Sequence, residues 1–79
     1  MVILRNIKRT ENTMEADFYP EGRGAKGFVK ISLPDGEFIT KIPSADYPTS
    51  GSAFAHAKYE LLRLAKREKL PEEKTVLWY

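Results

Sequence analysis

One segment, between Ser50 and Lys69, carries apolar residues at helical spacing, and it constrains the fold more than any other feature. The helix is expected to begin at Ser50 or Ser52, because a serine hydroxyl can accept a hydrogen bond from a free N–H group. It is expected to run to about Lys69, before Pro71. On a helical projection the apolar side chains form one stripe, made of Ala53, Phe54, Ala57, Leu61, Leu64 and Ala65, with Leu62 at its margin. A stripe on one side predicts a helix that covers a sheet.

Extended segments surround this helix. Alternating apolar residues predict strands over residues 2–8, 13–19, 28–33, 37–42 and 74–79. Pro34-Asp35-Gly36 separates the third and fourth segments and predicts a hairpin, because proline presets one turn dihedral and glycine accepts a positive φ. On the second segment Met14, Ala16 and Phe18 share the face expected in the core.

Two core assignments stay open at this stage. In the first segment either Ile3 with Ile7 or Val2 with Leu4 supplies the buried face. In the fourth, the choice lies between the pair of positions 38 and 42 and the single position 39. The expected fold is a single α+β domain over residues 1–79, with an antiparallel sheet of four to five strands in the order β-β-β-β-α-β. The last strand is free to return beside the first.

Length and composition limit the classes of function. A chain of 79 residues has room for one small core, so self-association is one route to greater stability. There is no cysteine, which excludes a disulfide framework, a thiolate metal site and a cysteine nucleophile. The start of the chain lacks the apolar core of a signal peptide, and no run of about 18 apolar residues occurs. We therefore expect a bacterial cytoplasmic protein with no membrane partner.

The loop Gly22-Arg23-Gly24-Ala25-Lys26-Gly27 is glycine-rich and basic. Exposed N–H groups beside Arg23 and Lys26 are candidate contacts for an anion. The P-loop pattern, however, requires Lys and then Ser or Thr after its last glycine, whereas Phe28 follows here. An ordinary connection between strands is the alternative interpretation.

A basic arc lies near the end of the predicted helix. Arg63, Lys66 and Arg67 are candidate contacts for RNA or DNA, because clustered cations attract a phosphate backbone. The alternative is a mixed, salt-bridged solvent face, since Glu60 and Glu68 interrupt the positive charge.

The remaining polar candidates do not complete a mechanism. His56 is the single histidine, and it lies on the polar side of the helix one turn before Glu60. Glu15 and Asp17 share one face of a strand, where Lys30 or Lys41 is placed to neutralise them. We therefore expect no enzyme, no metal and no cofactor.

Trp78 and Tyr79 close the sequence and admit two interpretations. They lock the last strand into the core, or they form an apolar patch that contacts a partner protein or a second copy.

The sequence shows two resemblances to known proteins, and the first of them spans the chain. Residues 10–20 and 74–79 are similar to those of short uncharacterised proteins of Gram-positive bacterial genomes, a likeness that implies no assigned activity. The segments Gly27-Phe28-Val29 and Leu33-Pro34-Asp35-Gly36, followed by an alanine-rich helix, resemble HicB-type antitoxins, which implies a βββαβ sheet.

Two functions follow as hypotheses. The first is a non-catalytic module that binds another protein or its own copy, motivated by the small core, an open strand edge and the aromatic terminus. The alternative is an RNA- or DNA-binding accessory factor that uses the basic end of the helix.

Overall fold

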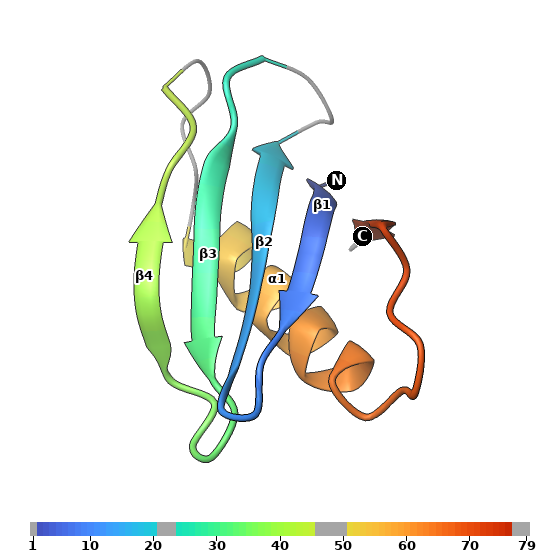
Figure 1. The fold of residues 1–79 in the computed structure, drawn as a ribbon. Helices are drawn as coiled ribbons and strands as arrows, with labels where there is room; N and C mark the ends of the chain where they lie inside the picture. The colour runs from blue at the N-terminus through green and yellow to red at the C-terminus, as the bar shows by residue number, and fades with distance from the viewer. Residues whose placement is uncertain (1, 21–23, 46–50, 77–79) are drawn as a thin grey trace.

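The structure, a computed structural model, describes residues 2–20, 24–45 and 51–76. It contains a five-stranded antiparallel sheet with one helix packed against one of its faces (Figure 1). The elements along the chain are β1 Val2–Arg9, β2 Thr13–Pro20, β3 Gly27–Ser32, β4 Phe38–Ile42, α1 Gly51–Leu64 and β5 Glu73–Val76. The predicted α+β class and element order are therefore confirmed.

The strands lie in the order β4-β3-β2-β1-β5, so β4 and β5 form the two edges of the sheet. The final strand returns beside the first, with Val2 opposite Val76. We call the face covered by α1 the inner face and the opposite one the outer face. The helix crosses the sheet obliquely on the inner face, and Figure 1 shows no described segment over the outer face.

The predicted hairpin between β3 and β4 is present. Gly36 has a φ of 72°, and its N–H donates to the carbonyl of Ser32 at 2.7 Å. The Asp35 Oδ1 atom accepts a hydrogen bond from the Glu37 N–H at 2.9 Å, so a side chain within the turn stabilises the turn backbone. Turn chemistry visible in the sequence therefore sets this connection.

A β-bulge in β4 resolves the ambiguity of that strand. Ile31 lies opposite Phe38 and Lys30 lies opposite Thr40, so Ile39 is an extra residue on the β4 side. Phe38 packs against the core, while the exposed fractions of Ile39 and Ile42 are 52% and 51%. Neither sequence alternative is right in full, because the bulge places Phe38 and Ile42 on opposite faces.

A second bulge divides β1. Arg5 lies opposite Asp17 and Lys8 lies opposite Glu15, so three steps along β1 match two along β2. Asn6, in the bulge, has a φ of 53°. Val2, Leu4 and Ile7 are all buried, so each of the two sequence alternatives for this strand contributed to the core.

The helical stripe lies on the sheet as predicted. Ala53, Phe54, Ala57, Leu61 and Leu64 are buried, and Leu62 and Ala65 are partly buried against the same core. The ring of Phe54 stacks on Phe18 of β2 at 5.0 Å between centroids and meets Phe38 of β4 edge-on at 6.2 Å. These three rings join the helix to the sheet.

The helix ends earlier than predicted, at Leu64 instead of about Lys69. Beyond Leu64 the chain tightens, and the N–H groups of Lys66 and Arg67 donate to carbonyls three residues earlier. The Arg9 guanidinium donates to the carbonyls of Ala65, Arg67 and Glu68, at 2.9, 2.6 and 3.4 Å. An arginine from a distant strand therefore binds carbonyl groups that a longer helix would pair with its own N–H groups.

Candidate functional site

The open edge at β4 is the most distinctive surface of the described structure. β4 pairs with β3 on one side, and Figure 1 shows no described segment along its other side. Three of its residues, Ile39, Lys41 and Ile42, are exposed. An edge strand presents unpaired N–H and C=O groups, and here large apolar side chains lie beside them.

The other edge, β5, has a different character. It spans four residues, and two of them, Glu73 and Lys74, are charged. The Glu73 carboxylate binds the Arg5 Nε atom at 3.1 Å, and the Lys74 ammonium lies 3.8 Å from Glu60 of the helix. Charged side chains tied to the body of the domain are a common protection of a sheet edge.

A row of side chains crosses the outer face from one edge to the other. The strand register aligns Glu73, Arg5, Asp17, Phe28 and Ile42 across all five strands. The row is polar toward β5 and apolar toward β4. The apolar end of the row therefore continues the apolar surface of the β4 edge onto the outer face.

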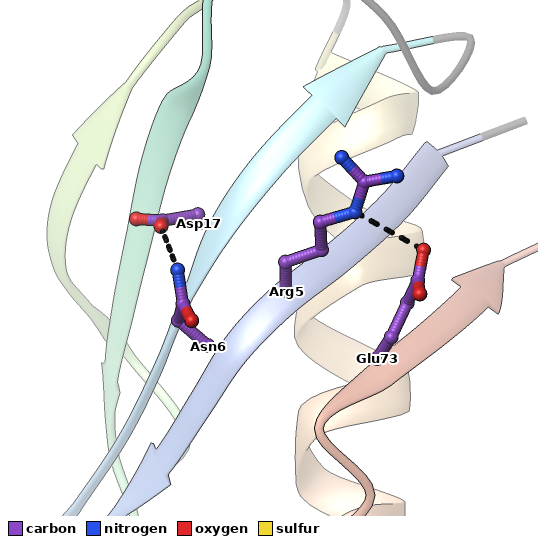
Figure 2. Close-up of polar contacts among 4 residues, drawn as sticks. All are labelled: Arg5, Asn6, Asp17 and Glu73. Atoms are coloured by element: carbon purple, nitrogen blue, oxygen red, sulfur yellow. Dashed lines mark hydrogen bonds and ion pairs between the residues drawn. The ribbon is translucent and has the colours of Figure 1, made fainter.

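Asp17 anchors the polar half of that row. Only 8% of the residue is exposed, although it lies on the face that carries no helix. The Asn6 Nδ2 atom donates to Asp17 Oδ2 at 2.7 Å, and the Lys26 ammonium binds the same oxygen at 3.4 Å. Figure 2 shows the Asn6 and Asp17 side chains turned toward each other, and the neighbouring Arg5 turned toward Glu73.

The inner side of the β4 edge carries two lysines. The Lys41 ammonium lies 4.9 Å from the centroid of the Phe38 ring and 5.5 Å from that of Phe54. The Lys58 ammonium, from α1, lies 5.2 Å from the Phe38 centroid. Both ammonium groups therefore lie over aromatic rings, at distances typical of cation–π contacts. We call this pair, with the Phe38 ring, the lysine rim.

The structure separates the predicted anion-binding residues into two groups. Arg63, Lys66 and Arg67 lie at the end of α1, whereas Lys26 belongs to the connection between β2 and β3, at the opposite end of the sheet in Figure 1. Arg63 binds Glu60 at 3.2 Å, while Lys66 and Arg67 are exposed. The basic end of the helix thus consists of two exposed cations beside one paired arginine.

The glycine-rich loop is described from Gly24 onward, and Arg23 lies outside the described residues. Lys26 reaches back to Asp17, and the Ser44 hydroxyl donates to the Ala25 carbonyl. Both contacts tie the end of the loop to the sheet. Anion binding here remains a prediction.

The predicted partner contacts Trp78 and Tyr79 also lie outside the described residues. Their assignment as a lock on the core or as a docking patch remains a prediction. The strand that precedes them is described as far as Val76, whose side chain is buried.

The catalytic candidates are not brought together. Glu15 and Asp17 point to the outer face, opposite Lys30 and Phe28, whereas His56 belongs to the helix on the inner face. Lys30 lies opposite Glu15 as one of the two sequence alternatives has it, whereas Lys41 lies on the inner face and Asp17 is bound by Asn6 and Lys26. Within residues 2–20, 24–45 and 51–76, no group of three His, Asp or Glu side chains is placed to hold a metal ion.

Comparisons with family models, with curated proteins and with solved structures gave no match to this chain. Among the described residues, no helix is long and apolar enough to cross a membrane.

Sequence reasoning missed the residues that define both the edge and the polar cluster. Ile39 and Ile42 read as core candidates because a bulge leaves no mark in an alternating pattern. The alternating pattern treats Asn6 as a regular strand residue, although asparagine is one of the few residues that accept a positive φ readily. An asparagine within an alternating apolar run was the available signal for the second bulge.

Proposed function

We propose that this domain is a non-catalytic protein-interaction module that accepts an extended segment of a partner as a sixth strand along β4. The single observation that carries the proposal is an edge strand that pairs with no other described strand on its outer side and has two isoleucines more than half exposed. Main-chain hydrogen bonds to a sheet edge supply affinity in this mode of recognition, and alternate side chains supply specificity.

The apolar surface supports an added strand in particular. Ile42 lies at the edge, and its cross-strand neighbour Phe28 extends the apolar surface inward on the outer face. A side chain of the added strand that pointed to this face would cover Ile42, because paired residues on neighbouring strands have Cβ atoms about 4.5–5.5 Å apart. Covering Ile42 in this way would remove apolar area from water.

The contrast between the edges favours β4 over β5. Charges at Glu73 and Lys74 are bound to Arg5 and Glu60, so a strand added at β5 would meet charged side chains that already have partners in the domain. β4 holds one charged residue, Lys41, and no carboxylate. Its bulge at Ile39 shortens the regular part of the edge, which limits the partner to a short segment.

Binding fits the arrangement of polar groups better than catalysis does. The buried carboxylate of Asp17 is held by two donors, and Glu15 and His56 lie on opposite sides of the sheet. A general acid or base needs a partner within hydrogen-bond reach of a reacting group.

A bacterial cytoplasmic location remains a prediction.

Binding to RNA or DNA is the second candidate. Its support is the pair of exposed cations Lys66 and Arg67 at the end of α1. Two phosphate contacts give a shallow dependence on salt and a weak affinity. Titration of the intact protein with mixed single- and double-stranded oligonucleotides at low salt tests this role.

Selection of random linear peptides, displayed on phage, against the intact protein tests strand addition. We expect the selected peptides to slow amide hydrogen exchange in β4. The double substitution Ile39→Asn and Ile42→Asn should lower their affinity at least about tenfold, since a few desolvated side chains near the centre of an interface carry most of its binding energy. Both side chains are more than half exposed, so the fold should tolerate the change.

Tyr59→Asn is the matched control, because Tyr59 is the other large exposed apolar residue described and lies on the helix. It should leave peptide affinity within about twofold, since the Tyr59 ring reaches the edge only through the Lys58 ammonium, which lies 5.7 Å from its centroid. Peptides that protect β5 or α1 instead of β4, or a selection that yields no binder sensitive to the isoleucine substitutions, would overturn the proposal. Tight, salt-dependent binding of oligonucleotides without peptide binding would favour the second candidate.

A further inference from the structure

We propose that the segment accepted by β4 carries an acidic side chain that binds the lysine rim formed by Lys41, Lys58 and the Phe38 ring. This inference rests on the proposed function and specifies the chemistry of its partner. It starts from the convergence of two ammonium groups, from a strand and from the helix, within 4.9 and 5.2 Å of one ring centroid.

The two lysines differ from three other cations near the sheet. Arg5, Lys26 and Lys74 each bind a carboxylate of the same domain. Among the described residues, neither Lys41 nor Lys58 lies within ion-pair distance of a carboxylate. Within the described ranges their positive charge therefore faces aromatic rings, and it is available to a carboxylate of a partner.

The position of the rim matches the geometry of an added strand. Lys41 lies opposite Val29, which is fully buried on the inner face, so Lys41 emerges on the helix side of the edge. A new strand would lie about 4.8 Å from β4 and place alternate side chains on the helix side. A glutamate or aspartate opposite Lys41 would then approach the Lys41 ammonium, and the Lys58 ammonium beside the same Phe38 ring would add to the positive potential there.

The same alternation specifies the neighbouring positions. Residues next to the acidic one point to the outer face, where Ile42 and Phe28 present apolar surface. The expected ligand is therefore an extended segment in which an acidic residue is flanked by apolar ones, preferably β-branched or aromatic.

A second copy of this chain fits the edge less well. Antiparallel pairing of β4 with its copy uses a two-fold axis normal to the sheet, so both helices lie on one side of the joined sheet. The rims of the two copies would then meet on the same face, and four ammonium groups would gather without a carboxylate. Like charges on neighbouring strands are destabilising, which favours an acidic partner over self-pairing.

The test uses the selected peptides themselves and a charge-matched pair of variants. We expect the peptides that protect β4 to be enriched in Asp or Glu between apolar residues. The double substitution Lys41→Gln and Lys58→Gln should lower their affinity about five- to tenfold, as expected for two exposed ion pairs. Added salt should remove most of this difference.

Lys8→Gln with Lys69→Gln is the control, because it removes the same charge at two exposed sites, at the end of β1 and beyond α1. It should leave affinity within about twofold. β4-binding peptides without acidic residues, or equal affinity for both double variants, would overturn the inference while strand addition stands. If no selected peptide protects β4 in the intact protein, the proposed function itself is overturned. Concentration-dependent dimers with a protected β4 would overturn the preference for an acidic partner.

Discussion

Asn6 occupies a backbone conformation that most L-residues avoid. Its φ of 53° lies in the left-handed region. There the β-carbon comes close to the following carbonyl oxygen, and this close approach raises the conformational energy by roughly 1–2 kcal/mol. Asparagine accepts this region more readily than alanine does. The same residue donates 2.7 Å to the buried carboxylate of Asp17 (Figure 2). The bulge and the polar cluster are therefore two results of one side chain.

Substitution of Asn6 separates these two contributions. Asn6→Gly keeps the permissive backbone and loses the hydrogen bond, so it should lower the free energy of unfolding by about 1 kcal/mol. Asn6→Ala also introduces strain and should lower it by about 2 kcal/mol. Urea unfolding followed by circular dichroism measures both. Equal stability of the two variants would show that the positive φ is not required.

At the scale of the element, the end of α1 is decided by a contact that spans most of the chain. Arg9 and the carbonyls it binds are separated by 56–59 residues. An exposed helix end leaves carbonyl groups without intrahelical partners, and a guanidinium carries several donors in one plane. The segment from Ala65 to Glu68 follows the arginine and leaves the helix.

Loss of Arg9 should therefore loosen this segment. Arg9→Ala should lower the free energy of unfolding by about 1–2 kcal/mol and speed amide exchange at residues 65–70. Arg67→Ala removes the same charge but keeps its backbone carbonyl, so it is the control and should have an effect within about 0.5 kcal/mol. Equal exchange in both variants would mean that the guanidinium does not hold the segment.

At the scale of the whole molecule, one cluster of three aromatic rings joins the two layers. Phe54 stacks on Phe18 in the centre of the sheet and meets Phe38 at the edge. A domain of this length has a total stability of about 4–12 kcal/mol, so the removal of one large core side chain is a large fraction of it. The lysine rim is built on the same Phe38 ring, which links core packing to the proposed binding edge.

Phe54→Ala should lower the free energy of unfolding by about 3–5 kcal/mol, because it leaves a cavity between the sheet and the helix. Tyr59→Ala, an aromatic truncation on the exposed side of the same helix, should change it by less than about 0.5 kcal/mol. Chemical denaturation of both variants measures the difference. A similar loss in the two would contradict the assigned packing of α1.

Local patterns in the sequence were sufficient for the elements and for the covered face of the helix. Helical spacing placed Phe54, Ala57 and Leu61 on the sheet, and Pro34-Asp35-Gly36 specified the hairpin. These predictions succeeded because periodicity and turn chemistry act between residues that are near in sequence.

The tertiary structure alone decided where the strands change faces, where the helix ends and which surface is open. Each of the two bulges reverses the alternation of its strand, so Ile42 became a surface residue and Ile7 a core residue. The Arg9 contact and the lysine rim join residues far apart in the chain. Such features depend on the register of neighbouring strands and on the approach of distant side chains, and neither leaves a period in the sequence.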